Sequence, residues 1–362
     1  MDDILMARKR RRVVVAMSGG VDSSVAAALL VEQGYEVIGM MMRLWSEPGS
    51  EAYNRCCTPE AMALARRVAA KLEIPFFAVD AKQVFHERVV KYFIDGYMQG
   101  ITPNPCLVCN REIRWEFLLK HALELGADFM ATGHYTRLRT DTTGKVQILR
   151  AVDEAKDQTY VLHVLTQAQL AHAIFPLGYY TKSQIRQLAR DYGLPVAERP
   201  DSQDLCFLGN GDYRSFLIRN APQVEEPGPI LTREGEILGK HQGLAFYTIG
   251  QRKGLGIAAP HPLYVLEKDK GSNALIVGKK EELGKRELFA VNTNWVSGEA
   301  PGKAFRAQVK IRYKAREAGG WVTPREDGRT YVLFDEPLRD ITPGQAAVFY
   351  KGEVCVGGGI IQ

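Results

Sequence analysis

The chain has 362 residues, of which 46% are hydrophobic and 25% charged, and its formal net charge is +5. This length is too great for one ordinary domain, and the composition is that of a water-soluble globular protein. No apolar run is long enough to span a membrane. The mild positive charge permits a polyanionic partner without requiring one.

Basic residues 8–12, followed by apolar residues 13–17, superficially resemble a secretory signal. The apolar run is too short for one and leads directly into Ser-Gly-Gly-Val-Asp. We therefore expect a cytoplasmic protein whose six cysteines stay reduced, where grouped cysteines indicate metal or redox chemistry more than structural disulfides. The pattern assigns no role to Cys56, Cys57 or Cys355.

Short apolar segments alternate with amphipathic segments through the first two hundred residues. We expect strands at residues 13–17, 36–44, 75–80 and 128–132 and helices at 23–33, 59–72, 110–125 and 182–192. Thr58 is a suitable N-cap and Pro59 a suitable first residue for the second helix. Alternation of this kind predicts an α/β fold with a mostly parallel sheet covered on both faces.

The pattern changes after residue 210, where turns rich in glycine and proline separate short strands. From residue 287 we expect only strands, at residues 305–313, 330–334, 346–350 and 354–357. A closed barrel is the natural way to hide the edges of so many short strands. The expected organisation is a catalytic α/β domain at residues 1–212, a small central domain at 213–284 and a β-barrel at 285–362.

A loop at residues 18–24, Ser-Gly-Gly-Val-Asp-Ser-Ser, joins the first expected strand to the first expected helix. Its glycines allow the backbone to approach phosphates, and the helix N-terminus favours an anion. The common phosphate loop contains a lysine that reaches the β- and γ-phosphates. That lysine is absent here, and a loop without it is suited to binding pyrophosphate as the leaving group. Asp22 is suited to hold the Mg²⁺ that neutralises pyrophosphate. The heptapeptide resembles the signature of the PP-loop ATP pyrophosphatases, which implies an adenylated intermediate.

Cys106 and Cys109 lie in Thr-Pro-Asn-Pro-Cys-Leu-Val-Cys-Asn, and Cys206 lies in Asp-Ser-Gln-Asp-Leu-Cys-Phe. We expect Cys109 at the N-terminus of the helix beginning near Asn110, where the helix dipole favours a thiolate. A zinc site is disfavoured because no suitably spaced histidine supplies a fourth ligand. Two thiols could carry a persulfide and resolve it as a disulfide. Alternatively, three thiolates could hold a [4Fe–4S] cluster with one open iron.

Further motifs follow in one order along the chain. They are residues 102–105 and 109–110, Ala131–Tyr135, Lys156–Gln158, Cys206–Phe207, His241–Gly243, Gly250–Gly256, Arg312–Tyr313, Thr342–Ala346 and Gly357–Ile360. With the phosphate loop they resemble the bacterial tRNA-specific 2-thiouridylases of the MnmA/TrmU family over nearly the whole length. The resemblance implies a PP-loop (adenine nucleotide alpha hydrolase-like) domain, a small central domain and a C-terminal β-barrel.

The resemblance implies 2-thiolation of the wobble uridine (position 34) of tRNA for Lys, Glu and Gln. ATP would adenylate the uridine 2-oxygen, because an unactivated carbonyl oxygen is a poor leaving group. Sulfur carried by Cys206 would then replace the oxygen, with AMP and pyrophosphate as products. Cys109 would be the second catalytic cysteine and the disulfide partner.

The resemblance also assigns binding residues. The residues expected to bind ATP are Ala16, Met17, Ser18, Gly19, Gly20, Val21, Asp22, Ser23, Met42 and Gly133. Those expected to contact the target base are Asn104, Pro105 and Cys106, and those expected to contact tRNA are His134, Lys156, Asp157, Gln158, Arg312, Tyr313 and Gln345. From the residues alone, the alternatives are that His134 is an ordinary loop residue and that Lys156 and Arg312 are ordinary surface charges.

One residue departs from the family pattern, because many members carry aspartate at the position of Cys106. A cysteine there creates Cys-x-x-Cys plus the distal Cys206, which resembles the cluster-dependent tRNA thiolases. The persulfide relay and the cluster of Cys106, Cys109 and Cys206 therefore both stay open.

Two other functions fit parts of the sequence. A PP-loop ligase would need no cysteines, and a non-catalytic tRNA-binding module would have no use for Asp22, Cys109 and Cys206 together. The expected cofactors are ATP and Mg²⁺, with the cluster as an addition. The expected partners are tRNA and a sulfur donor, which is a cysteine desulfurase or a sulfur-relay protein. The enzyme is expected to be a monomer.

Overall fold

The computed structural model describes residues 10–49, 58–200, 205–208 and 212–362. Residues 8 and 9 of the basic segment at 8–12, Cys56, Cys57 and residues 201–204 before Cys206 lie outside the described residues. No described helix has the length and apolar character needed to cross a membrane. The chain divides into two compact units: unit 1 takes the described residues of 1–84, 111–159 and 167–209, and unit 2 those of 85–110, 160–166 and 210–362.

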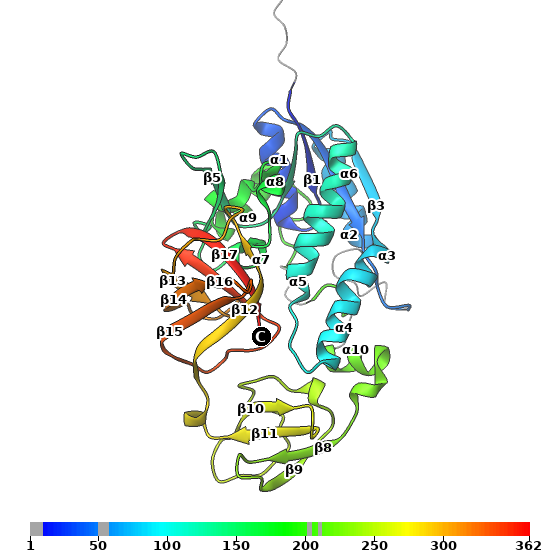
Figure 1. Cartoon of the computed structure of the whole chain (residues 1–362). Helices are drawn as coiled ribbons and strands as arrows, with labels where there is room; N and C mark the ends of the chain where they lie inside the picture. The colour runs from blue at the N-terminus through cyan, green and yellow to red at the C-terminus, as the bar shows by residue number, and fades with distance from the viewer. Residues whose placement is uncertain (1–9, 50–57, 201–204, 209–211) are drawn as a thin grey trace, which may run out of the picture. The chain divides into compact units, whose positions relative to one another are not determined.

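Unit 1 is built on a parallel sheet, with five strands in the described residues in the order β3-β2-β1-β4-β7 (Figure 1). Val13, Val14 and Val15 of the central strand are fully buried, as expected for a strand covered on both faces. The strands are β1 Arg12–Ala16, β2 Glu36–Arg43, β3 Phe76–Asp80, β4 Phe129–Thr132 and β7 Ala173–Ile174. The expected α/β architecture and the first four expected strands are confirmed.

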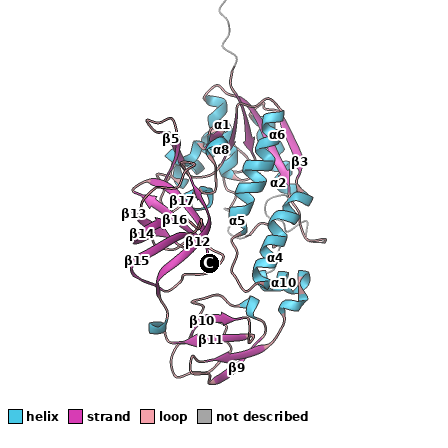
Figure 2. Ribbon diagram, viewed as in Figure 1, coloured by secondary structure: helices cyan, strands magenta, loops and turns pink. Residues whose placement is uncertain are grey.

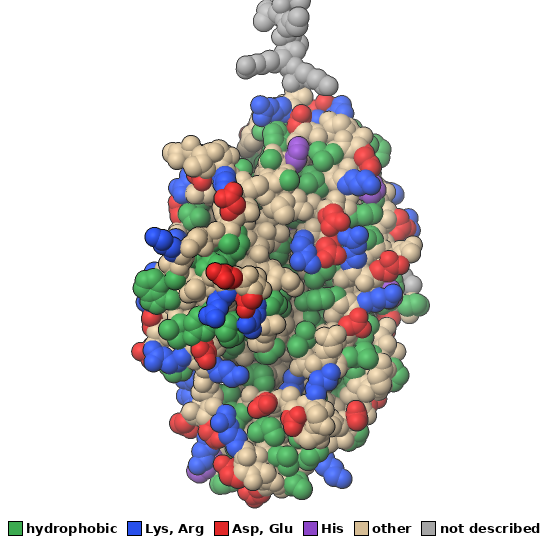
Figure 3. Space-filling view, in the orientation of Figure 1, with side chains coloured by type: hydrophobic (Ala, Val, Ile, Leu, Met, Phe, Trp, Pro, Cys, Tyr) green, Lys and Arg blue, Asp and Glu red, His purple; other side chains and the backbone are tan. Residues whose placement is uncertain are grey.

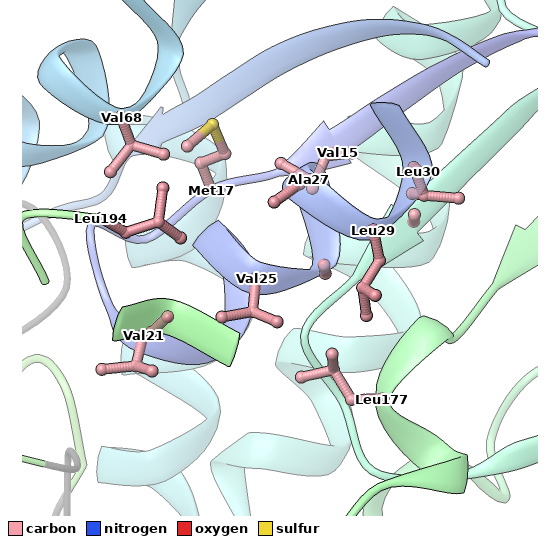
Figure 4. Close-up of a cluster of buried hydrophobic side chains, with 14 of the residues drawn as sticks. Val15, Met17, Val21, Val25, Ala27, Leu29, Leu30, Val68, Leu177 and Leu194 are labelled. Carbon is pink, nitrogen blue, oxygen red and sulfur yellow. The ribbon is translucent and has the colours of Figure 1, made fainter. Parts of the chain in front are cut away.

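Helices run alongside the strands of this sheet (Figure 2). The helix α1 is buried at Val21 and at every residue from Ser23 to Leu30, and it packs against β1, β2, β4 and α9. Its Val25, Leu29 and Leu30 belong to one apolar core with Val15 of β1 and Val68 of α2 (Figure 4). The bounds are α1 Val21–Glu32, α2 Pro59–Lys71, α6 Leu119–Glu124, α8 Gln167–Leu170, η4 Pro176–Tyr179 and α9 Lys182–Asp191.

The start of α2 follows the expected capping pattern. Thr58 Oγ1 accepts a hydrogen bond from the Ala61 N–H at 3.0 Å, and Pro59 is the first helical residue. An antiparallel hairpin that the sequence analysis did not predict follows β4 in the chain. It consists of β5 Arg137–Thr140 and β6 Val146–Leu149.

Unit 2 includes residues 85–110 because aromatic side chains connect them to the later part of the chain. Phe93 packs edge-on against Phe216 at 6.0 Å between ring centroids, and Tyr97 stacks on Tyr213 at 5.1 Å. The helical elements are α3 Lys82–Phe85, η2 His86–Val90, α4 Lys91–Met98, α5 Pro105–Val108, η3 Cys109–Leu118, α7 Thr159–Leu162, α10 Tyr213–Asn220, η5 Pro222–Val224, η6 Leu244–Phe246 and η7 Lys280–Glu282. Of these, α3, η3 and α7 run across a boundary between the units.

The later part of unit 2 forms two sheets. A small sheet has the order β10-β11-β8-β9 among the described strands, which are β8 Gly228–Leu231, β9 Ile237–His241, β10 Tyr264–Asp269 and β11 Ala274–Gly278. A barrel follows in the order β12-β15-β14-β13-β16-β17, and β12 also pairs with β17. Its strands are β12 Lys285–Trp295, β13 Phe305–Lys310, β14 Ala318–Pro324, β15 Thr330–Leu338, β16 Ala346–Lys351 and β17 Val354–Ile361.

Alternation along the barrel strands places apolar side chains inside. Phe305, Ala307 and Val309 of β13 are buried, whereas the residues between them are exposed. The pairing of β12 with β17 closes the sheet into a barrel, so neither of these two described strands is an open edge strand. The expected C-terminal β-barrel is confirmed.

Candidate active site

The phosphate loop joins β1 to α1 at the carboxyl edge of the unit 1 sheet. Gly19 has a φ of +71°, and a Cβ there would lie 2.3 Å from the Ala61 carbonyl oxygen. Only glycine fits this position without displacing α2. The Ser18 N–H donates to Ser23 Oγ at 3.1 Å, and among the described residues no side chain caps α1 at Gly20. The first N–H groups of α1 are therefore available to an anion.

Gly133 lies beside the phosphate loop, and Met42 lies at the carboxyl edge of the same sheet. A Cβ on Gly133 would lie 2.7 Å from Ser23 N and 2.8 Å from Asp22 C, so the residue after β4 must be glycine for α1 to start here. Met42 is half-buried near the carboxyl end of β2, which neighbours β1. In open parallel sheets, ligands bind at the carboxyl ends of the strands. The expected ATP residues of unit 1 are thus grouped at one edge of its sheet.

Asp22 is held by two side chains that the sequence analysis missed. Lys182 Nζ donates to both carboxylate oxygens, at 2.7 and 2.9 Å, and the Tyr135 hydroxyl donates to Oδ1 at 2.7 Å. The Lys182 side chain is 13% exposed, so solvent screens this ion pair only partly. A lysine therefore stands beside the loop although the loop itself has none.

The position of Lys182 follows from the start of α9. Thr181 Oγ1 accepts from the Gln184 N–H and the Gln184 side chain accepts from the Thr181 N–H, which is a complete capping box. Lys182 is the first helical residue, and its N–H donates to Asp153 Oδ2 at 2.9 Å. Backbone and side chain of Lys182 are thus both held, and the ammonium points at Asp22.

Arg199 contacts the loop from the segment after α9. Its Nη1 donates to the Gly19 carbonyl oxygen at 2.6 Å. Arg186 of α9 donates to the carbonyl oxygens of Ala197 and Arg199 at 3.0 and 3.1 Å. Two cationic side chains, Lys182 and Arg199, therefore lie at the loop, which favours binding of a polyphosphate.

His134, which we expected to contact tRNA, is buried. Its Nε2 lies 2.9 Å from Arg114 Nη1 and its Nδ1 lies 2.7 Å from Thr132 Oγ1. Arginine can only donate, so Nε2 accepts and Nδ1 carries the proton. Burial and then the positive charge of Arg114 hold the pKa of His134 well below its usual range. The imidazole is neutral and holds Arg114.

The Lys156–Gln158 segment is also engaged within unit 1. Asp157 is buried, and its carboxylate accepts from the Ala151 N–H at 2.9 Å and the Thr159 hydroxyl at 2.6 Å. Gln158 Oε1 accepts from the Tyr135 N–H at 2.9 Å, and Lys156 is half-buried. Asp157 thus holds its own segment through Ala151 and Thr159, and Gln158 supports the segment that carries Tyr135. Their contact with tRNA stays a prediction.

The helix carrying Cys106 and Cys109 in unit 2 begins five residues earlier than expected. Asn104 is its N-cap, with Oδ1 accepting from the Cys106 N–H at 3.1 Å, and Pro105 is the first residue of α5. Cys109 therefore lies beyond the first turn, and the expected position of its thiol at the helix N-terminus is wrong. A proline is a good first helical residue because it lacks the N–H that would be unpaired there.

The two thiols of this segment differ in exposure. Cys106 is exposed and Cys109 is 9% exposed. Three residues apart in a helix, they lie on one face. Cys206 is half-buried in unit 1, and Cys355 is buried in β17. Among the residues that the structure describes, no three His, Cys, Asp or Glu side chains are placed together as metal ligands.

The three remaining residues expected to contact tRNA lie in unit 2. Arg312 Nη2 donates to the Ile249 carbonyl at 3.1 Å and to the Thr342 hydroxyl. Tyr313 is 38% exposed. Gln345 Nε2 donates to the Thr102 carbonyl at 2.8 Å. Arg312 and Gln345 therefore have structural roles within unit 2, whatever they contact in addition.

Comparisons with known proteins identify the family. Residues 11–210 match the family model described as the tRNA methyl transferase HUP domain, residues 214–279 that of its PRC-barrel domain, and residues 285–361 the aminomethyltransferase β-barrel domain. The chain is 50% identical over 347 residues to the tRNA-specific 2-thiouridylase MnmA of Moorella thermoacetica, covering 95% of this chain and 97% of that one. It is 49% identical over 347 residues to MnmA 2 of Caldanaerobacter subterraneus, covering 95% of both. The chain belongs to the MnmA family of tRNA-specific 2-thiouridylases.

As a member of the MnmA family, the chain is an ATP-binding sulfurtransferase that thiolates a uridine of tRNA. Unit 1 contains the groups suited to the nucleotide, namely the phosphate loop, Lys182 and Arg199. The thiols lie in both units, with Cys206 in unit 1 and Cys106 and Cys109 in unit 2.

A solved structure with a similar fold is the U34-tRNA thiolase NcsA from Methanococcus maripaludis with its [4Fe–4S] cluster. It is 19% identical with a TM-score of 0.37, and the match covers 60% of this MnmA-family chain and 67% of that chain. A 4-thiouridine synthetase–RNA complex with bound ATP is 18% identical with a TM-score of 0.38, covering 59% and 51%. These likenesses are too low to carry an argument about mechanism.

Proposed function

We propose that the enzyme thiolates C2 of the wobble uridine (position 34) in tRNA for Lys, Glu and Gln, with ATP as the activating substrate. The observation that carries the proposal is the phosphate loop of unit 1, where Lys182 and Arg199 surround Asp22 and Gly19. Family membership supplies the tRNA substrate, and the loop supports activation by adenylation.

In the first step the uridine 2-oxygen attacks the α-phosphorus of ATP, and the bond to pyrophosphate breaks. The N–H groups at the start of α1, with Lys182 and Arg199, stabilise the negative charge that gathers on the departing pyrophosphate. Asp22 would hold the Mg²⁺ that accompanies ATP, which neutralises phosphate charge. Because Lys182 occupies both Asp22 oxygens, Lys182 would transfer from Asp22 to the phosphates when the nucleotide binds.

In the second step the terminal sulfur of a Cys206 persulfide attacks C2, and the C–O bond to AMP breaks. The Cys109 thiolate then attacks Sγ of Cys206, so the persulfide S–S bond breaks, a Cys109–Cys206 disulfide forms and the outer sulfur stays on C2. A thiol reductant must reduce that disulfide before the next turnover. Asn104, Pro105 and Cys106 would face the target base, which must leave the anticodon stack.

A [4Fe–4S] cluster held by Cys106, Cys109 and Cys206 is the second candidate arrangement. The observation that favours it is the pair of thiols on one helix face, with Cys106 in α5 and Cys109 directly after it. The two arrangements differ in what Cys106→Asp does: the relay keeps its two cysteines and its activity, whereas a cluster loses one ligand. Wild-type and Cys106→Asp protein are purified anaerobically and analysed for iron and sulfide, which decides between the relay and the cluster. Iron-free wild-type protein with full activity rules out a required cluster.

The cellular setting is also proposed. The sulfur donor would be a cysteine desulfurase or a sulfur-relay protein, and the enzyme would act as a cytoplasmic monomer. Its catalytic domain would cover residues 1–212, its central domain 213–284 and its tRNA-contacting barrel 285–362.

Basic and acidic side chains are interspersed over the face drawn in Figure 3, so tRNA binding would depend on particular residues more than on a uniform positive field.

The test is one assay with ATP, a persulfide donor and tRNA bearing a wobble uridine. We expect wild-type enzyme to form 2-thiouridine with equimolar AMP and pyrophosphate. Cys206→Ser should lose thiolation and keep pyrophosphate release, whereas Cys355→Ser, in the buried barrel strand, should keep both. Full thiolation by Cys206→Ser would remove Cys206 from the mechanism, and wild-type thiolation without pyrophosphate release would disprove adenylation.

A further inference from the structure

Thr102, four residues before Cys106, is bound through its backbone to a loop of the barrel. Its N–H donates to the Pro343 carbonyl at 2.9 Å, and its carbonyl accepts from Gln345 Nε2 at 2.8 Å. Gly344 has a φ of +92°, and a Cβ there would lie 2.9 Å from the Thr102 carbonyl carbon and oxygen. The 343–345 loop therefore packs directly on Thr102, and both polar backbone groups of Thr102 are satisfied by it.

Asn104 makes a second connection between the barrel and the cysteine segment. Its Oδ1 caps α5 by accepting from the Cys106 N–H at 3.1 Å, which leaves the amide NH₂ as the donor. The Asn104 side chain also acts on the Tyr160 hydroxyl as a donor that lowers the pKa of the phenol, so the NH₂ lies on the side of the phenol oxygen. The orientation of the N-cap amide is thus set at both ends.

Tyr160 transmits this contact to the first residue of β16. It is fully buried, and its hydroxyl donates to the Ala346 carbonyl at 3.1 Å and accepts from the Ala346 N–H at 3.3 Å. Burial raises the pKa of Tyr160, so the phenol keeps its proton at neutral pH. A path of interacting groups therefore runs from Ala346, hydrogen-bonded to Tyr160, past the neighbouring Asn104 to the backbone of Cys106.

The barrel residues expected to contact tRNA adjoin this path. Gln345 immediately precedes Ala346, the barrel end of the path, and makes the separate bond to Thr102. The Tyr313 ring lies 6.0 Å from the Tyr160 ring between centroids. Arg312 donates to the hydroxyl of Thr342, at the start of the loop that holds Thr102. A ligand that engages Gln345 competes with the Thr102 carbonyl for the same amide protons.

We propose that Tyr160 and Gln345 are positioning residues through which the barrel sets the start of the cysteine helix, so that tRNA engaged by the barrel repositions Cys106 and Cys109. The link to catalysis rests on the proposed function. The path from the barrel to the thiols does not, and it can be tested without turnover.

The experiment measures iodoacetamide alkylation of each cysteine in the native full-length protein by peptide mass spectrometry. Tyr160→Phe removes only the hydroxyl that joins Ala346 to Asn104. Tyr213→Phe is the matched control, because it removes a tyrosine hydroxyl of unit 2 that donates to another backbone carbonyl, that of Phe246, at 3.0 Å. Gln345→Ala removes the other connection independently.

We expect Cys109, which is 9% exposed, to be alkylated about fivefold faster in Tyr160→Phe and in Gln345→Ala, the factor that loss of one hydrogen bond produces. In Tyr213→Phe its rate should equal that of wild type. Wild-type Cys109 rates in both Tyr160→Phe and Gln345→Ala would overturn the proposal. Alkylation of buried Cys355 reports unfolding of the protein. If Cys355 becomes reactive in Tyr160→Phe, the Cys109 alkylation rate in Gln345→Ala decides whether the proposal holds.

A kinetic measurement separates positioning from general structure. Tyr160→Phe should lower kcat for thiolation about tenfold and leave the Kd for tRNA unchanged, because the phenol itself is buried away from the ligand. An equal loss in Kd and kcat would contradict this. If wild-type enzyme does not thiolate tRNA at all, the proposed function fails, whereas the alkylation result still decides whether the barrel positions Cys109.

Discussion

Lys182 supplies at Asp22 the positive charge that the phosphate loop lacks in sequence. The two residues are 160 positions apart, so no local pattern could pair them. The signal that was present is the helix start at Thr181, because a capping box fixes the backbone from which the Lys182 side chain leaves. Sequence reasoning predicted a loop for an anion at residues 18–23 and missed the cations that the fold brings to it.

We predict that Lys182→Ala lowers the rate of pyrophosphate release about 100-fold, since removing one preorganised group that stabilises developing charge has this effect. The control is Arg190→Ala on the same helix, whose side chain is exposed and pairs with Glu198 at 3.0 Å. It should keep wild-type activity. The measurement is tRNA-dependent pyrophosphate release at saturating ATP; equal rates in Lys182→Ala and Arg190→Ala would refute a role for Lys182 at the phosphates.

His134 shows why a motif does not fix what a side chain contacts. The segment Ala131–Tyr135 was recognised from sequence, but burial of His134 depends on Phe175 and Arg114, which come from other elements. Its contact with tRNA stays a prediction, and the structure assigns it a support role for Arg114. Tyr160 was not predicted at all, because a buried tyrosine after a motif has no pattern of its own.

At the scale of elements, the expected strands and helices were right wherever caps and apolar periodicity agreed. The helix expected at Asn110 starts at Pro105 instead. The sequence analysis missed that Asn104 followed by Pro105 is a helix start. In the structure, Cys106 therefore lies in the first helical turn, where Cys109 was expected.

The start of α9 gives a prediction at this scale. Thr181→Ala should cost about 1 kcal/mol of unfolding free energy through loss of the N-cap, and because Lys182 is the next residue, pyrophosphate release should fall about tenfold. Asp212→Ala is the matched control, since it removes the N-cap of α10 in unit 2, where Oδ1 accepts from the Ser215 N–H at 2.9 Å. Denaturant unfolding and the pyrophosphate assay should separate the two variants. Equal activity in both would mean that the α9 cap does not set Lys182.

At the scale of the molecule, strand patterns predicted the parallel sheet and the barrel but not the composition of unit 2. Residues 85–110 precede β4 in the chain, yet they belong with the C-terminal residues. The cause is long-range aromatic packing, such as Phe93 on Phe216, which periodicity along one segment does not reveal. The consequence is that Cys109 shares a unit with the barrel, while Cys206 shares one with the phosphate loop.

This division predicts that ATP binding and tRNA binding are lost separately. Tyr313→Ala should raise the Kd for tRNA about tenfold, the effect of losing one aromatic stacking contact, and leave ATP binding unchanged. Trp321→Ala is the matched control, because Trp321 is another exposed barrel aromatic, 50% exposed, outside the expected tRNA contacts. Filter binding of tRNA and equilibrium binding of ATP measure the two affinities. A larger loss of tRNA affinity in Trp321→Ala than in Tyr313→Ala would place the tRNA on a different face of the barrel.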